Sequence, residues 1–247
     1  MRTLTRVKIL GVGGAGNNAV TRLSKLKLAG AELIAINTDI QDLQKTKADV
    51  KLRIGRQTTQ GLGTGMNPEL GRSAAQEQKN EIEDLVKDSD LVFLAAGLGG
   101  GTGSGALPLI AQLCRDQGIL TMTVVTKPFS FEGSSRMNIA KEAIKNLTGR
   151  VDCLLVLDND KLILATEKNT PLAKAFLLAD EILHQAVVSI LDLVLRPSLV
   201  SISFADVRTC LKNSGPGFFG QGLGQGQSRS QEAVARALNS PLLEISP

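Results

Sequence analysis

Two glycine-rich segments carry the residues of this sequence that are best suited to chemistry. The first reads Gly-Val-Gly-Gly-Ala-Gly at residues 11–16, and the second reads Gly-Gly-Gly-Thr-Gly-Ser-Gly at residues 99–105. Each follows an apolar, strand-like run and precedes a run with helical patterning. Glycines at such a junction let backbone N–H groups approach an anion, and the start of the helix adds the positive end of its dipole. Together the segments indicate a polyphosphate ligand that is held from two sides.

Two other kinds of glycine-rich site are less consistent with this pattern. A P-loop needs Gly-Lys-Ser/Thr after its glycines, and neither segment contains a lysine. The first segment alone fits the Gly-x-Gly-x-x-Gly of a dinucleotide-binding dehydrogenase, with Asp39 as the acid about 20 residues further on. A dehydrogenase of this kind needs only the first glycine segment, so the second segment would remain unexplained. NAD binding therefore stays an alternative that a spectral test for bound nicotinamide would decide.

Composition narrows the class of protein. The chain has 247 residues, of which 43% are hydrophobic, enough for one large domain or two small ones. Its 28 basic and 24 acidic residues leave a net charge of +4 and no dense basic block, so we expect no nucleic-acid partner. No signal peptide is visible and no apolar run approaches the ~20 residues of a membrane span, so no direct membrane contact is expected.

The cysteines and the single histidine predict no metal site. Cys114, Cys153 and Cys210 are far apart and lie in apolar stretches, which is typical of reduced core thiols. His184 falls within a long helical pattern and is expected to be structural.

Strand-like and helical patterns alternate along the chain. Strands are predicted at 7–10, 32–37, 50–54, 90–96, 120–126 and 153–157, and helices at 17–28, 69–87, 105–117 and 135–147. This alternation predicts a doubly wound α/β fold whose ligands lie at the carboxyl ends of parallel strands. A long helix begins at Pro171, which Thr170 can cap, and ends at Arg196. A strand at 199–204, a short helix from Asp206, a flexible loop at 214–229 and a last helix at 231–238 follow.

Several stretches resemble one family. Residues 99–105 match the glycine motif of the tubulin/FtsZ superfamily, and residues 9–20, 36–43, 61–71, 128–136 and 204–209 are similar to FtsZ, its cell-division GTPase. The resemblance covers nearly the whole chain. It implies a doubly wound, mostly parallel sheet of the tubulin/FtsZ GTPase type with a long central helix, and GTP or GDP as ligand with Mg²⁺ on the phosphates.

The resemblance also implies an organisation of the chain. Residues 1–168 would form the GTP-binding domain, and 169–213 would form the long central helix, an intersubunit catalytic loop and the helix after it. Residues 214–247 would form a flexible loop and terminal helix, at the point where the family chain begins a second domain that this sequence lacks.

The nucleotide contacts are carried over residue by residue. By resemblance, Glu132 and Arg136 hold the ribose side, while Asn159 and Asp180 read guanine. A carboxylate such as Asp180 can accept hydrogen bonds from guanine N1–H and N2–H. The structural alternatives are a polar position on a helix for Asp180 and an ordinary turn at Asn159. The expected phosphate contacts are Gly13, Gly14, Asn18, Gly63, Thr64, Gly65, Gly99, Gly100, Gly101, Thr102, Gly103, Ser104 and Gly105.

The catalytic loop departs from the family. The family pattern Asn-x-Asp-Phe-Ala-Asp reads Ser-Ile-Ser-Phe-Ala-Asp at residues 201–206, so Asp206 is retained while Ser201 and Ser203 replace Asn and Asp. Serine forms hydrogen bonds but carries no negative charge. We expect Asp206, with Ser203 beside it, to act on a neighbouring subunit's nucleotide and to support slow hydrolysis. Asp206 also suits a helix N-cap, and the two roles are compatible.

The implied function is a cytoplasmic GTPase that assembles head to tail into filaments, at the division site if it shares the family's task. The alternative is a GTP-binding domain that does not polymerise and instead caps or regulates filaments of a full-length FtsZ. Sedimentation with GTP separates these two interpretations.

Overall fold

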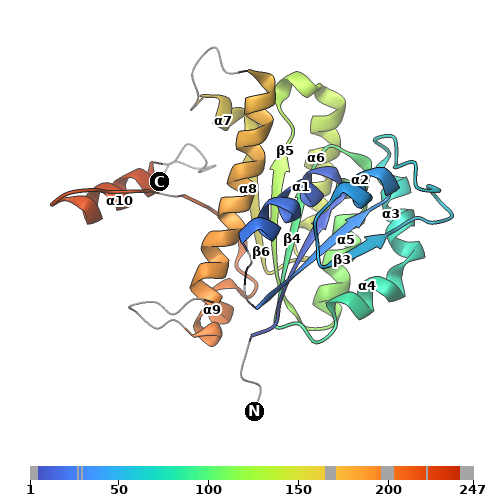
Figure 1. Cartoon of the computed structure of the whole chain (residues 1–247), viewed down its shortest axis with the longest axis horizontal. Coiled ribbons are helices and arrows are strands. Elements are labelled where there is room, and N and C mark those ends of the chain that lie inside the picture. The colour runs from blue at the N-terminus through green and yellow to red at the C-terminus, as the bar shows by residue number, and fades with distance from the viewer. Residues whose placement is uncertain are drawn as a thin grey trace.

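Seven parallel strands form a single sheet in the computed structural model of the protein (Figure 1). The structure describes residues 5–26, 28, 30–164, 171–195, 203–220 and 222–239. Across the sheet the strands follow the order β3 (Val50–Arg53), β2 (Ala31–Asn37), β1 (Val7–Val12), β4 (Leu91–Gly97), β5 (Leu120–Lys127), β6 (Cys153–Asp158) and β7 (Gly215–Gly217). The order reverses between β1 and β4, which makes this pair the switch point of a doubly wound sheet.

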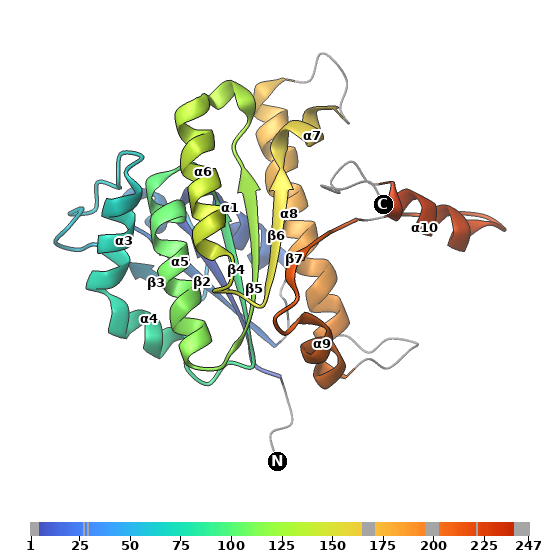
Figure 2. The same ribbon diagram turned by 180° about the vertical axis from the view of Figure 1, so that it is seen from behind.

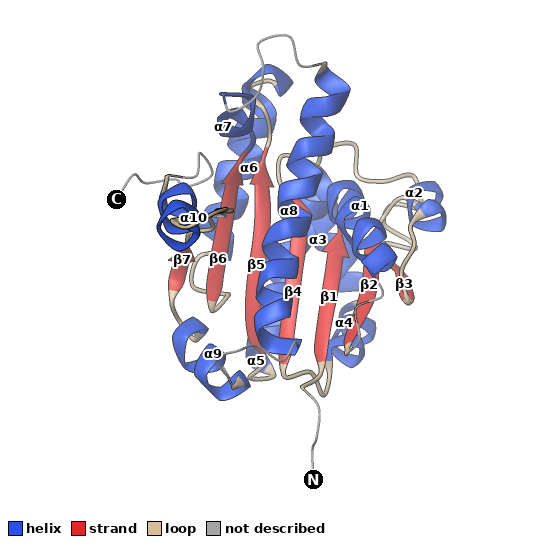
Figure 3. Ribbon diagram, turned by 60° about the vertical axis from the view of Figure 1, so that its left-hand side comes forward, coloured by secondary structure: helices blue, strands red, loops and turns tan. Residues whose placement is uncertain are grey.

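Helices cover both faces of the sheet. One face carries α1 (Gly13–Leu23) and α8 (Leu172–Leu195), which lie side by side in Figure 3. Behind the sheet in that view lie α3 (Pro68–Glu77), α4 (Lys79–Val86), α5 (Gly101–Asp116) and α6 (Ser134–Leu147), which come forward in Figure 2. The predicted doubly wound fold is confirmed.

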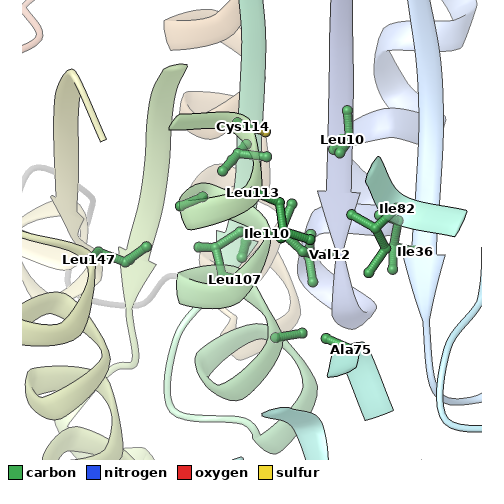
Figure 4. Packing of buried hydrophobic residues seen from close by; sticks show 14 of the residues in the cluster. Leu10, Val12, Ile36, Ala75, Ile82, Leu107, Ile110, Leu113, Cys114 and Leu147 are labelled. Carbon is green, nitrogen blue, oxygen red and sulfur yellow. The ribbon is translucent and has the colours of Figure 1, made fainter. Parts of the chain in front are cut away.

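Each face of the sheet has its own hydrophobic cluster because the central strands are apolar on both sides. Side chains of β1 and β2 meet α3, α4 and α5 in the first cluster, where Leu10, Ile36 and Ile110 are fully buried (Figure 4). The second cluster joins the other face to α1 and α8, with Phe93 and Leu183 in its interior. Because helices cover both faces of the sheet, a ligand can approach the strands only at their ends.

Short elements occupy the edges. They are α2 (Ile40–Lys45), α7 (Asn159–Leu164), α9 (Phe204–Leu211) and α10 (Arg229–Leu238). α9 lies at the edge where the strands begin, and α10 projects away from the sheet (Figures 1 and 3). Within the described ranges, no helix is long and apolar enough to cross a membrane.

The structure differs from the predicted elements in several places. α1 and α5 begin at Gly13 and Gly101, inside the glycine segments rather than after them. The helix predicted at 69–87 is interrupted at Gln78, whose side-chain oxygen accepts the backbone N–H of Gly55 at 2.5 Å. The loop predicted at 214–229 contains β7, which extends the sheet beyond β6. The strand predicted at 199–204 lies mostly outside the described residues, and Phe204 begins α9.

The cysteines divide into two kinds. Cys114 and Cys153 are buried as predicted, and burial raises the pKa of the Cys114 thiol to about 12. The prediction for Cys210 is wrong, because this thiol is exposed on α9. α9 has no fully buried residue, and its apolar side chains Phe204 and Leu211 pack only partly against the core.

Candidate functional site

A cleft of about 360 Å³ opens at the carboxyl ends of the strands, at the switch point between β1 and β4. Loops that follow β1, β4, β5 and β6 contribute to it, and α8 closes one side. Eleven of the predicted residues line this cleft: Gly13, Gly14, Thr64, Gly100, Gly101, Thr102, Gly103, Glu132, Arg136, Asn159 and Asp180. Residues that are far apart in the sequence therefore meet where a doubly wound sheet binds its ligands.

Two helices begin at this cleft without a side-chain cap. Neither α1 at Gly13 nor α5 at Gly101 has a capping hydrogen bond from its N-cap side chain. Their first N–H groups and the positive ends of both helix dipoles are thus directed toward one site. Gly13 has a φ of +72°, and a Cβ there would lie 3.1 Å from the backbone nitrogen of Gly103, so glycine is needed for the two loops to approach.

Three threonine hydroxyls join the second glycine segment to its neighbours. The Oγ1 of Thr102 lies 2.7 Å from the Oγ1 of Thr38, which follows β2, and 3.4 Å from the Oγ1 of Thr64. Thr64 belongs to the loop between β3 and α3. This loop therefore contacts the first turn of α5, and Thr64 lines the cleft.

Asp39 has a structural role. Its Oδ1 accepts the backbone N–H groups of Gln41 and Asp42 at 2.8 and 3.1 Å and so caps α2. Asp39 is absent from the described lining of the cleft. It is therefore not placed as a dehydrogenase's ribose-binding acid would be.

Asn159 and Asp180 present polar groups to the far side of the cleft. Asn159 is buried, and its Oδ1 has no hydrogen-bond partner among the described residues. An oxygen Oδ2 of Asp180 lies 3.5 Å from Nη2 of Arg22 on α1. Burial raises the pKa of Asp180, and the charge of Arg22 partly opposes this shift. Both side chains can serve a ligand that donates hydrogen bonds.

Three phenylalanine rings form a cluster beside Glu132 and Arg136, and one of them reaches the cleft. The Glu132 carboxylate accepts the N–H of Phe129 at 2.8 Å and pairs with Arg136 at 2.7 Å. Phe129 is fully buried and stacks on Phe131, with ring centroids 4.9 Å apart. Phe176 of α8 meets Phe129 edge to face and also lines the cleft.

Some predicted residues lie beside the cleft rather than in its lining. Asn18 is exposed on α1, whereas its neighbour Asn17 is buried with both side-chain polar atoms unpartnered among the described residues. The hydroxyl of Ser104 accepts the N–H of Gly99 at 2.9 Å, and so shapes the second glycine segment from within. Gly105 packs against α3, since a Cβ there would lie 1.9 Å from the carbonyl oxygen of Pro68. Gly63 and Gly65 flank Thr64 with φ of +79° and +55°.

Other lining residues were not predicted. Phe176 and Ala179 share one face of α8 with Asp180, and their spacing of three and four residues was a signal that could have identified them. The remaining ones, Ala15, Gly97, Leu98, Thr126 and Pro128, carry no distinctive chemistry.

Comparison with known proteins agrees with this geometry. Residues 6–166 match the sequence model of the GTPase domain of the tubulin/FtsZ family. An FtsZ dimer from M. jannaschii is 44% identical over 99% of this chain and 71% of its own, with a TM-score of 0.95. The chain belongs to the tubulin/FtsZ family. A CetZ2 protofilament from Haloferax volcanii, bound to GTPγS, shares the fold at 22% identity and a TM-score of 0.76, over 90% of this chain and 68% of that one.

Family membership makes this chain an FtsZ-like GTPase domain. The tubulin/FtsZ family binds GTP and GDP, so the cleft lies in a guanine-nucleotide-binding fold.

In this FtsZ-family chain the two candidate catalytic residues lie far from the cleft. Ser203 and Asp206 form a reciprocal cap at the start of α9: the Ser203 hydroxyl donates to Asp206 Oδ2 at 2.6 Å, and the Asp206 N–H donates back at 3.2 Å. The side-chain hydrogen bond from Ser203 lowers the pKa of Asp206. α9 lies at the edge where the strands begin, opposite the cleft (Figure 3). Ser201 lies outside the described residues.

Proposed function

We propose that the cleft binds GTP and GDP, that copies of the chain assemble head to tail into filaments, and that GTP is hydrolysed slowly where two copies meet. One observation carries the proposal: two uncapped helix N-termini converge at the switch point, in the same cleft as a buried asparagine oxygen that finds no partner in the part of the chain that the structure describes. Backbone N–H groups match phosphate oxygens, and the Asn159 oxygen matches a donor on a base.

The residues of the cleft divide between the two ends of such a nucleotide. The first turns of α1 and α5 would hold the phosphates, and Thr64 with Gly63 and Gly65 would respond to the terminal one. Asp180 and Asn159 would face the base, where a carboxylate favours guanine over adenine because guanine offers two adjacent donors. Glu132 and Arg136 would flank the ribose. Mg²⁺ would be held by phosphate oxygens and water, as is usual for this ion.

Head-to-tail assembly is supported by the position of Asp206. The acid lies at one edge of the sheet and the cleft at the other, so a chain cannot bring its own Asp206 to its own nucleotide. A second copy stacked in the same orientation would place α9 against the cleft. Such heterologous contacts repeat without closing and generate filaments when the rotation between copies does not form a ring.

Asp206 would orient and polarise the water that attacks the terminal phosphate. An aspartate is charged at neutral pH, and the hydrogen bond from Ser203 lowers the pKa of Asp206 further. Ser203, which replaces a second acid of the family pattern, contributes a hydroxyl that is already bonded to Asp206. A single carboxylate in place of two accounts for slow hydrolysis.

This proposal assigns a role to each segment of the chain. Residues 1–168 would bind the nucleotide, 169–213 would connect it to the acid of α9, and 214–247 would lead toward a further domain of the family. In the cell, the filaments would assemble in the cytoplasm, at the division site.

The decisive experiment is high-speed sedimentation of the pure protein with GTP, GDP or a slowly hydrolysed GTP analogue, with phosphate release measured in the same samples. We expect pelleting with GTP and the analogue, none with GDP, and phosphate release that rises with the amount of polymer. Nucleotide binding without any pelleting would contradict filament assembly and favour the capping or regulatory role. Absence of nucleotide binding would refute the assignment of the cleft.

A further inference from the structure

A second hollow, of about 230 Å³, lies at the edge of the sheet where the strands begin. It is bounded by the C-terminal end of α5, the start of β5 and one side of α9 (Figure 2 shows these elements together). Arg208 reaches it from α9, and Lys212 reaches it from the C-terminal end of that helix. Arg115 reaches it from the end of α5. None of these residues belongs to the nucleotide cleft.

Positive charge predominates in this hollow. Three cations line it against a single carboxylate, Asp152. That carboxylate is already used, because its Oδ2 accepts the N–H of Thr121 at 2.8 Å and its Oδ1 accepts the N–H of Asn213 at 3.1 Å. Among the described residues, no ion pair involves any of the three cations, and Arg208 makes a single long hydrogen bond, to the carbonyl oxygen of Gly118 at 3.4 Å.

The volume of the hollow and the donors that line it restrict the class of ligand that could bind there. Drug-sized ligands and cofactors occupy pockets of about 300–1,000 Å³, so this hollow suits something smaller. Guanidinium groups present forked N–H donors that match the oxygens of phosphate, and an ammonium adds a compact charge. We propose that the hollow lined by Arg115, Arg208 and Lys212 is a binding site for a small tetrahedral oxyanion of the phosphate class.

An anion at this position would connect two parts of the fold. Arg115 belongs to the body of the domain, whereas Arg208 belongs to α9 and Lys212 is the residue that ends this helix. The described polar ties of α9 to the body are the long bond to Gly118 and the bonds of the following residues to Asp152. A bound oxyanion shared by these cations fastens α9 to the start of β5. It thereby reduces the local opening of the helix that carries Asp206. The site itself does not depend on the function proposed for Asp206.

Hydrogen exchange of the intact protein tests the site, with inorganic phosphate as the probe and sodium chloride at equal ionic strength as the reference. Peptides over α9 report the proposed site, and peptides over residues 97–105 report phosphate bound in the nucleotide cleft. We expect phosphate, added to about 10 mM as suits a weak anion site, to slow exchange in α9 saturably, by about threefold or more.

Variants locate the effect. The double variant Arg115→Gln, Lys212→Gln should lose the protection of α9, while Lys141→Gln, which removes an exposed cation from α6, should retain it. Each variant is first checked for an unchanged melting temperature in chloride; if the double variant is unstable, the single variant Lys212→Gln, an exposed position, replaces it. Protection confined to residues 97–105, no protection at all, or equal protection in the Arg115/Lys212 variant would overturn the proposal.

Discussion

The carboxylate of Asp180 on α8 lies 3.5 Å from the guanidinium of Arg22 on α1, and the same guanidinium lies 3.6 Å from Glu181. α1 begins at the phosphate side of the cleft, and Asp180 lines its opposite side. The ion pair therefore links α8 to the C-terminal end of the helix whose first turn lines the cleft. Of the two acids that Arg22 contacts, Asp180 lines the cleft and Glu181 does not. Substitutions at the two positions can therefore distinguish a role in ligand binding from a role in helix packing.

Asp180→Asn should reduce selectivity for GTP over ATP about tenfold or more, because an amide cannot accept two hydrogen bonds from guanine with the strength of a carboxylate. Competition binding of the two nucleotides measures this. Glu181→Gln is the matched control, since it also removes a contact to Arg22 but should leave the selectivity intact. Equal selectivity in Asp180→Asn and the native protein would remove Asp180 from the base pocket.

Asp206→Asn should abolish residual GTP hydrolysis and leave the affinity for GTP within about twofold, because the residue lies at the opposite edge from the cleft. Asparagine keeps an oxygen that accepts hydrogen bonds and so preserves the cap of α9 with Ser203. Phosphate release and nucleotide binding are measured on the same samples. A parallel loss of both would show that Asp206 acts through folding. Conversely, Ser203→Asp adds a second carboxylate and should raise the rate.

Gly71→Ala should destabilise the fold by about 1–3 kcal/mol, because the new Cβ would lie 2.2 Å from the carbonyl oxygen of Gly101 and force α3 away from α5. Thermal or denaturant unfolding measures the change. Gly14→Ala is the control, since a Cβ there meets only Asp42 Oδ2, at 3.5 Å, and α1 is helical at this position. It should be neutral or slightly stabilising. Similar losses for the two variants would contradict close packing of α3 on α5.

Glu77 should make stability depend on pH in the acid range. Burial acts to raise its pKa, but hydrogen bonds from Gln78, Gln57 and Thr58 prevail and lower it from 4.5 to about 2. A lowered pKa in the folded state means that the stabilisation is complete above about pH 4.5 and is lost as the pH falls through about 2.

Glu77→Gln should therefore cost about 1 kcal/mol at neutral pH, a value that allows for solvent screening of this partly exposed group. The difference from the native protein should shrink toward pH 2, as urea unfolding at several pH values would show. Glu83→Gln, which removes only the surface pair with Lys79, should change stability by less than about 0.5 kcal/mol. A difference for Glu77→Gln that stays constant with pH would contradict the assignment.

Much of the fold could be predicted from local pattern. A continuous apolar run such as β4 is typical of a strand that is buried on both faces. The helical stretches between the strands match the crossover connections that parallel strands need. The interruption at Gln78 could not be predicted, because it depends on a hydrogen bond to Gly55, which is distant in the sequence. The pairing of β7 with β6 was missed for a similar reason: three residues, Gly-Pro-Gly, carry no strand pattern of their own.

From the sequence alone we could predict which residues would bring backbone N–H groups near a phosphate, that Asp206 lacks the second acid of the family pattern, and that the fold is doubly wound. Which of these residues meet was known only from the tertiary structure. It placed Gly13 against Gly103, Asp180 against Arg22, and Asp206 at the edge away from the cleft. Local propensity depends on neighbours along the chain. The position of a side chain at a site depends instead on packing between elements that can be far apart in the sequence.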